Sequence, residues 1–389
     1  MTKKAIKNGR IILPNAILEG KILLYDEKIL GIVDGVDPKE EIEWLDAKGN
    51  YISPGFIDIH IHGAYGFDAM DEQEEAIDNI SMGICERGVT GYLPATMTMS
   101  KERIHTALDN IRSSMGKRGR GARVLGAHME GPFIHPERKG AHDEAYILKP
   151  DYGLIADYLD VIRVITLAPE LDDGHKFIHQ MQEHPQVVLS IGHSNATFEE
   201  AMEAIEMGIR SATHLFNAMT GFHHRNPGVV GAILKSDIFC EAIADNVHIH
   251  PAIYSILGKV KGAEKIILIT DAMRAACLKN GIYDLGGQTV NVDDHAVRLE
   301  DGTLAGSILT MNYAVKNFLE NTDYDLPAII HMASLNPAKL LGLENQKGSL
   351  DLGKDADIII FNKDFEVLTT IVEGQLCFRR EKEDADHCC

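Results

Sequence analysis

Short apolar runs follow one another along the whole chain, and their pattern changes near residue 53 and again near residue 346. Up to residue 53, runs such as 16–24 and 29–33 are broken by turn signals and show no helical periodicity. From Ile52 onward, apolar runs alternate with amphipathic stretches, which is typical of strands and helices that alternate around a parallel sheet. Residues 348–377 return to the β-like character of the first segment.

The middle region predicts an α/β fold, a (β/α)8 TIM-like barrel, because it contains eight apolar runs with room for a helix between most of them. We expect residues 54–345 to form this barrel, inserted into a small discontinuous β-sandwich domain made of residues 1–53 and 346–380. Residues 381–389 are charged, and we expect a disordered tail there. The eight runs begin near Phe56, Gly91, Val124, Val161, Val187, Arg210, Cys240 and Lys265.

The composition is that of a globular protein, since 45% of the 389 residues are hydrophobic and 25% are charged. A formal net charge of −20 argues against nonspecific binding to nucleic acid or to an anionic membrane, and an anionic ligand would need a local basic pocket. No apolar run reaches 18 residues and no signal peptide is evident, so we expect a cytoplasmic protein. The six cysteines lack CxxC spacing, and we expect reduced thiols.

Two histidines end the first barrel run, in Asp58-Ile59-His60-Ile61-His62. A spacing of two places both imidazoles on one face of a strand, within reach of a single metal ion. The pair alone is equally compatible with two polar histidines of the barrel core or rim.

Further ionisable residues end other runs: Glu130 the third, His193 the fifth, His214 the sixth and Asp271 the eighth. Active sites of this fold lie where the strands end, so we expect these side chains to converge. A carboxylate with two neutral imidazoles leaves an open position on a divalent ion, as a catalytic metal requires. Asp271 is then a general base and acid beside a bound water, or else a further ligand. His128 lies two residues deeper than Glu130, and we expect it beside the ligand set or in the core.

Five segments around the strand ends form a specific set of motifs. They are His128-Met129-Glu130-Gly131-Pro132-Phe133, Lys139-Gly140-Ala141-His142, Gly192-His193-Ser194, His214-Leu215-Phe216-Asn217-Ala218-Met219 and Thr270-Asp271-Ala272. With these segments the chain resembles the amidohydrolase superfamily and, within it, the N-acetylglucosamine-6-phosphate deacetylases, from Ser53-Pro54-Gly55 to Ala356-Asp357.

This resemblance implies hydrolysis of the acetamide of N-acetylglucosamine 6-phosphate, a phosphorylated amino sugar, to glucosamine 6-phosphate and acetate. It makes Glu130, His193 and His214 metal ligands, Asp271 the catalytic carboxylate, and His142 the group that polarises the acetyl carbonyl. It implies a homodimer in which the arginine at position 225 can act across the interface. The implied substrate contacts come from Ala141, His142, Asn217, Ala218, Arg225 and His248.

The phosphate of such a substrate has a candidate partner in Arg225, which lies in the turn-rich loop after the sixth run. A guanidinium matches phosphate oxygens with two parallel hydrogen bonds and would supply the local basic site that an acidic protein needs. A solvated loop arginine is the alternative. His248 ends the seventh run and is expected on the same phosphate.

The number of metal ions depends on His60 and His62, because some members of the family lack these histidines and use one metal, whereas others keep both and can hold two. Retention of the pair here predicts one tight ion and a second ion bridged by Glu130. The carboxylated lysine of the superfamily is not evident, since the fourth run ends in Leu167-Ala168-Pro169-Glu170. Nitrogen and oxygen ligands suit zinc, iron, manganese or cobalt and do not identify the metal.

Two other functions remain open from the sequence. A cyclic-amide hydrolase or deaminase of the same superfamily would share the metal site without needing a phosphate clamp. A noncatalytic binding barrel would typically have lost its ligands. Residues 273–306 form a long connection with several turn signals, which predicts either a flap over the site or a structural hairpin.

Overall fold

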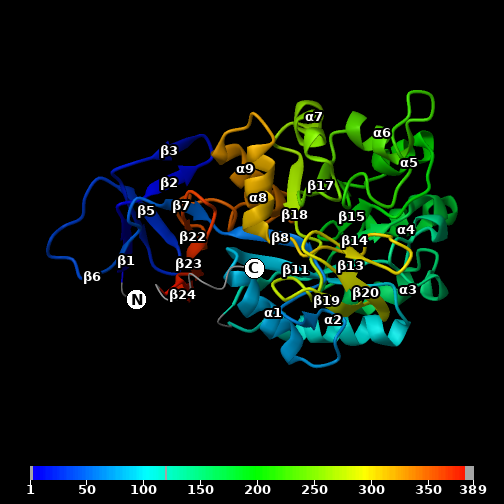
Figure 1. Cartoon of the computed structure of the whole chain (residues 1–389), viewed down its shortest axis with the longest axis horizontal. Coiled ribbons are helices and arrows are strands. Elements are labelled where there is room, and N and C mark those ends of the chain that lie inside the picture. Colours follow the sequence, from blue (N-terminus) through cyan, green and yellow to red (C-terminus); the bar gives the residue numbers. More distant parts are fainter. Residues whose placement is uncertain (1–2, 119–120, 382–389) are drawn as a thin grey trace.

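The computed structural model describes residues 3–118 and 121–381, and it places a sheet-rich part beside a barrel (Figure 1). Residues 382–389 of the predicted tail lie outside the described residues. Within the described ranges, no helix combines the length and the apolar character needed to cross a membrane.

Eight parallel strands form the barrel, in agreement with the predicted fold class. Each begins within three residues of a predicted apolar run, and nearly all of their side chains are buried, because helices cover the outer face and the inner face packs on itself. The strands are β8 (Phe56–Ile61), β11 (Val89–Thr96), β13 (Ala127–Glu130), β14 (Ile162–Leu167), β15 (Val188–Ile191), β16 (Ser211–Ala212), β17 (Phe239–Ile243) and β18 (Ile266–Ile269), with β12 (Arg123–Val124) beside β11.

The barrel closes where the last strand meets the first. The backbone N–H of Asp271 donates to the carbonyl oxygen of His60 (2.9 Å), and the N–H of His62 donates to that of Ala272 (2.8 Å). These bonds bring the residues that end β8 and β18 side by side on one rim.

Helices connect the barrel strands, and local sequence fixes where several of them begin. Ser100 caps α2 through its side chain, and Thr197 with Glu200 forms a capping box on α5. The helices are α1 (Glu75–Cys85), α2 (Lys101–Met115), α3 (Tyr152–Ile155), α4 (Lys176–Met181), α5 (Phe198–Glu206), α6 (Gly228–Lys235), α7 (Pro251–Lys261), α8 (Met311–Glu320), α9 (Leu326–Ala333) and α10 (Leu335–Leu340).

Both ends of the chain contribute to the sheet-rich part, in which β7 (Tyr51–Pro54) pairs with β2 (Arg10–Leu13) on one side and β22 (Ile358–Phe361) on the other. A second sheet, in the order β5-β4-β1-β6, packs on this one around a separate apolar core that includes Ile6, Ile52 and Ile358. The other strands are β1 (Lys3–Lys7), β3 (Ala16–Leu18), β4 (Ile22–Tyr25), β5 (Ile29–Val33), β6 (Ile42–Asp46), β23 (Val367–Val372) and β24 (Gln375–Arg379).

Two small antiparallel sheets lie at the rim of the barrel. One pairs β9 (Gly63–Ala64) with β10 (Phe67–Asp68). The other, after β18, joins β19 (Gly281–Leu285), β20 (Gln288–Val292) and β21 (Val297–Arg298) within the segment predicted as a flap or hairpin. The side-chain amide of Gln288 donates to the carbonyl oxygen of Ala141, which ties this second sheet to the loop after β13.

Candidate metal centre and substrate site

The ionisable residues predicted at the strand ends converge on one rim of the barrel. Glu130 ends β13, whereas His193, His214 and Asp271 each stand two residues after a strand. These last three residues have positive φ angles of 47°, 29° and 49°, in the left-handed region that residues other than glycine rarely adopt. Such backbone strain is found where a chain must aim a functional side chain.

The first group of ligand atoms consists of Glu130, His193 and His214. Oε1 of Glu130 lies 3.1 Å from Nε2 of His193 and 2.9 Å from Nε2 of His214, and the two nitrogens are 3.0 Å apart. Nδ1–H of His193 donates to the carbonyl oxygen of Arg138 (2.7 Å), so in the neutral ring the lone pair is on Nε2. A lone pair that faces a carboxylate oxygen requires a cation between them, and these atoms fit a divalent metal ion.

The second group consists of His60, His62 and Asp271. Nε2 of His62 lies 3.0 Å from Oε2 of Glu130 and 3.3 Å from Oδ1 of Asp271, and Nε2 of His60 lies 3.4 and 3.5 Å from the same oxygens. Nδ1–H of His62 donates to the carbonyl oxygen of Ala95 (3.2 Å), which directs Nε2 into the site. Glu130 therefore turns one oxygen toward each group.

Burial and charge oppose each other in the pKa values of these side chains. Burial raises the pKa of Asp271, but the charge on His60 and a hydrogen bond from His62 outweigh it and lower that pKa to about 2. Burial lowers the pKa of His62, but Asp271 and Glu130 outweigh it and raise that pKa to about 10. Burial lowers the pKa of His193 to about 4. Asp271 is thus ionised and His193 neutral near pH 7, as metal ligands must be, whereas His62 is protonated in the metal-free protein and would release its proton on binding an ion.

A cavity of about 320 Å³ opens onto both groups. A larger cavity of about 460 Å³ lies nearby, on the side of Asp245 and Cys277, but the two groups of ligand atoms do not line it. We therefore place the site in the smaller cavity. Besides the ligand residues, its lining includes Met97, Arg138, Ala141, His142, Asn217, Ala218, His248, Leu285 and Arg298.

His142 presents a hydrogen-bond donor to this cavity. Its Nδ1 accepts from the backbone N–H of Thr98 (3.1 Å), so in the neutral ring the proton is on Nε2. Nε2 lies 3.5 Å from Oε2 of Glu130, and the ring is buried. The donor therefore points toward the space beside the metal ligands.

The remaining predicted substrate contacts, except one, also line the cavity. Nδ1–H of His248 donates to Oδ2 of Asp245 (2.6 Å), which leaves Nε2 to face a ligand. Ala141 lies beside His142, and Asn217 and Ala218 follow β16 in a loop where Ala218 has a φ of 50°. Asn217 donates from its side chain to the carbonyl oxygens of His214 and Leu215, both at 3.3 Å.

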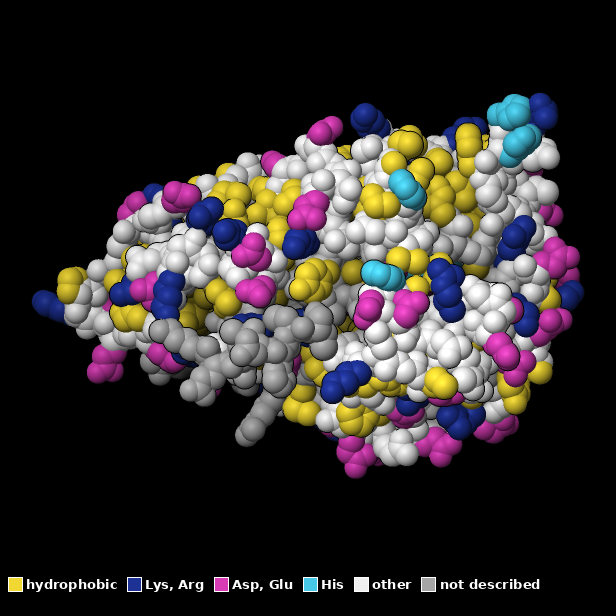
Figure 2. Space-filling model, viewed as in Figure 1, with side chains coloured by type: hydrophobic (Ala, Val, Ile, Leu, Met, Phe, Trp, Pro, Cys, Tyr) yellow, Lys and Arg dark blue, Asp and Glu magenta, His cyan; other side chains and the backbone are white. Residues whose placement is uncertain are grey.

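Arg225 is the residue that this chain does not bring to the cavity. It lies in the exposed loop between β16 and α6, where its guanidinium is 2.7 Å from Nε2 of His224. This loop projects from the barrel near α6 (Figure 1), and histidine and basic side chains gather at its tip (Figure 2).

His128 lies behind the ligands, beside the ring of His60 at a centroid distance of 4.3 Å. Its Nδ1–H donates to the carbonyl oxygen of Ile59 (2.8 Å), and Nε2 accepts from the hydroxyl of Thr166 (2.7 Å). Burial lowers the pKa of His128 to about 4, so the ring is neutral near pH 7. With both nitrogens occupied, His128 has no lone pair to give a metal.

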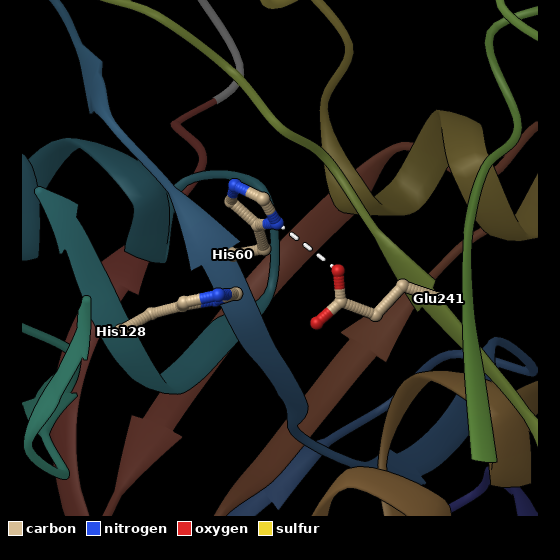
Figure 3. A group of neighbouring side chains, drawn as sticks. All are labelled: His60, His128 and Glu241. Carbon is tan, nitrogen blue, oxygen red and sulfur yellow. Dashed lines mark hydrogen bonds and ion pairs between the residues drawn. The ribbon is translucent and has the colours of Figure 1, made fainter. Parts of the chain in front are cut away.

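Glu241 and Asp245 are residues that the sequence reasoning missed. Glu241 lies in β17 with its side chain toward His60, as Figure 3 shows together with His128. A charged residue in the otherwise apolar run Phe239-Cys240-Glu241-Ala242-Ile243 was an available signal for it. Asp245 carried no such signal, because an aspartate just after a strand is common in turns.

The comparisons with known proteins agree with this geometry. A model of the amidohydrolase family matches residues 51–377. The chain is 38% identical to the N-acetylglucosamine-6-phosphate deacetylase of Bacillus subtilis (strain 168), over 97% of this chain and 98% of that protein. It is also 38% identical to the N-acetylgalactosamine-6-phosphate deacetylase of Escherichia coli O157:H7, over 90% and 95%. The crystal structure of N-acetylglucosamine-6-phosphate deacetylase from Pasteurella multocida superimposes with a TM-score of 0.90 at 34% identity, covering 96% of this chain and 99% of that chain.

Proposed function

Because the chain belongs to the amidohydrolase family, we propose that it hydrolyses the acetamide of N-acetyl-D-glucosamine 6-phosphate, in the cytoplasm, to D-glucosamine 6-phosphate and acetate. The observation that carries this proposal is the convergence of Glu130, His193 and His214 on one point, in a cavity that also receives Asp271 and His142. Relatives named for this reaction match nearly the whole chain.

Glu130, His193 and His214 would hold a divalent ion, with His60, His62 and Asp271 available for a second. A bound ion of this kind supplies Lewis acidity and lowers the pKa of water. Zinc, iron, manganese and cobalt all suit these nitrogen and oxygen donors. Glu130 would bridge two ions, since its oxygens face different groups.

The residues of the chain account for the proton transfers that accompany attack and C–N cleavage. Asp271 takes a proton from the attacking water, whose oxygen bonds to the acetyl carbon. Nε2–H of His142 donates to the carbonyl oxygen as negative charge develops there. Asp271 then returns the proton to the sugar nitrogen as the C–N bond breaks, and the second proton of the water passes from the carboxyl product to the amine, so that acetate and the ammonium form of the sugar leave.

The phosphate of the substrate is proposed to lie near His248, with Arg225 supplied by a second copy of the chain. Asp245 fixes the ring of His248, and the backbone of Asn217 and Ala218 lines the same cavity. A homodimer would bring Arg225 from its exposed loop to the neighbouring cavity. Apolar side chains gather on the same side of the molecule, over α6 and α7 (Figure 2), where Phe222, Ile256 and Val260 are more than half exposed.

Residues 273–306 are proposed to act as a flap over the substrate. Leu285 and Arg298 from this segment line the cavity, and Gln288 bonds to the backbone of Ala141 next to His142. Movement of the segment would therefore expose or cover the acetamide and its surroundings.

The test is the release of acetate from a panel of substrates by purified enzyme of known metal content. We expect turnover of N-acetylglucosamine 6-phosphate and a large loss when the 6-phosphate is absent. Faster turnover of N-acetylgalactosamine 6-phosphate would assign the sugar specificity of the relative from Escherichia coli O157:H7 instead. Hydrolysis of cyclic amides alone, or metal binding with no turnover of any amide, would refute the proposal.

A further inference from the structure

Glu241 is a carboxylate in an unusual place, because its side chain is fully buried within an apolar barrel strand. Among the described residues, the ion pair that it forms is with His60, and neither lysine nor arginine takes part. A buried carboxylate without a strongly basic partner is costly to a fold, so its retention points to a role at the site.

One oxygen of Glu241 holds one residue from each of the two metal-ligand groups. Oε2 accepts a hydrogen bond from Nδ1–H of His60 (3.0 Å) and another from the backbone N–H of His214 (3.1 Å). His60 belongs to the second group and His214 to the first. Figure 3 shows that the Glu241 side chain points at the ring of His60.

The bond to His60 decides which nitrogen of that ring faces the cavity. A carboxylate can only accept at Nδ1, so Nδ1 carries the proton and Nε2 points to Glu130 and Asp271. His128 cannot replace Glu241 in this role, although it lies against the same ring, because the Ile59 carbonyl and the Thr166 hydroxyl already occupy its nitrogens. His60, His128 and Glu241 also bring possible ligand atoms close together. They do not form a third metal site, because both nitrogens of His128 are already hydrogen-bonded.

The bond to His214 acts on the backbone. His214 has a φ of 29°, and its N–H is held by Glu241 rather than by a neighbouring strand. The same carboxylate thus stabilises a strained turn that aims one ligand of the first ion.

We propose that Glu241 is a positioning residue that holds His60 as a ligand of the second metal ion and, through its charge, makes that imidazole a stronger donor. This inference rests on the second ion of the proposed function. It does not depend on which amide the enzyme hydrolyses, so metal binding can test it separately from turnover.

The experiment titrates the metal-free protein with Zn²⁺ in chelator-buffered solutions and measures bound metal after dialysis. In E241Q the amide oxygen can still accept both hydrogen bonds, but the negative charge is lost. We expect the second ion to bind 10- to 100-fold more weakly in E241Q, and the first to bind within about threefold of the parent. In the H60Q background, E241Q should change metal binding no further.

Asp172→Asn is the matched control. Asp172 is also a buried carboxylate with two hydrogen bonds, both to backbone N–H groups at the start of α4, and it does not line the cavity. This control should leave both affinities unchanged. If E241Q binds both ions as the parent does, or weakens both ions equally together with a lower melting temperature, the positioning role is wrong. If the parent and the H60Q variant each bind a single ion, the second metal site of the proposed function is itself wrong.

Discussion

Replacement of Asp271 by asparagine removes the proposed proton acceptor while leaving the three ligands of the first ion unchanged. Asparagine tolerates the left-handed φ of 49° at this position, and the two backbone bonds that fix the residue, to His60 and Ser307, do not involve the side chain. The amide oxygen can still face Nε2 of His62, which lies 3.3 Å from Oδ1. The variant should therefore fold and keep its first ion, while it loses the group that accepts a proton and one charged ligand of the second ion.

The size of the loss follows from general acid–base catalysis, which contributes about 10²- to 10⁴-fold to a rate. Since Asp271 is proposed to move the proton twice, we expect kcat to fall by at least about 10³-fold, or about 4 kcal/mol. The assay is the initial rate of acetate release, with metal content measured on the same preparation and Asp172→Asn as the control. Turnover within tenfold of the parent at equal metal content would refute the assignment, whereas a loss of metal would show that Asp271 acts as a required ligand.

Three further predictions concern the pH dependence of stability, the phosphate and the flap. Burial raises the pKa of Asp58 to about 7, above its ordinary 3.8, so this group should lower the stability of the metal-free protein as the pH rises from about 4 to about 7. D58N should remove the contribution of Asp58 to the slope and gain up to about 4 kcal/mol over the parent at pH 8, measured by urea unfolding. An equal gain in the stability of D58N at pH 4 would contradict the raised pKa of Asp58. Arg225→Ala should raise KM for the 6-phosphate substrate at least tenfold, and an equal KM in parent and variant would exclude a phosphate contact. Gln288→Ala should increase the rate of amide hydrogen exchange in residues 281–298. An exchange rate that changes neither with this substitution nor with bound product would favour a structural hairpin.

The barrel could be predicted from the sequence because its strands are buried on both faces, which makes them continuous apolar runs. The fold class and the family resemblance were confirmed. The boundaries were less accurate, as for the third strand, predicted near Val124 and observed from Ala127 in β13. Val124 lies in the separate short strand β12, and Gly126 with a φ of 143° divides the two. The periodicity of apolar residues alone does not predict such a division of one run into two strands.

The site could be anticipated because parallel strands deliver their terminal residues to one rim. The roles of Glu130, His193 and His214 remain predictions, although the structure brings their ligand atoms together. Hydrogen bonds between distant segments could not be predicted from the sequence. The contact of Glu241 with His60, for example, joins residues 181 positions apart. The role of Arg225 cannot be read from one chain for another reason, because the cavity that it is proposed to reach belongs to a second copy.

The most direct test of the account compares one protein in three states: as purified, metal-free, and reloaded with a stated divalent ion. We expect acetate release from N-acetylglucosamine 6-phosphate to disappear on metal removal and to return in proportion to the ion bound. Glu130→Gln, which alters the carboxylate shared by both groups, should prevent this recovery. Undiminished acetate release by the metal-free protein, or full recovery in Glu130→Gln, would contradict the proposed metal-dependent deacetylation.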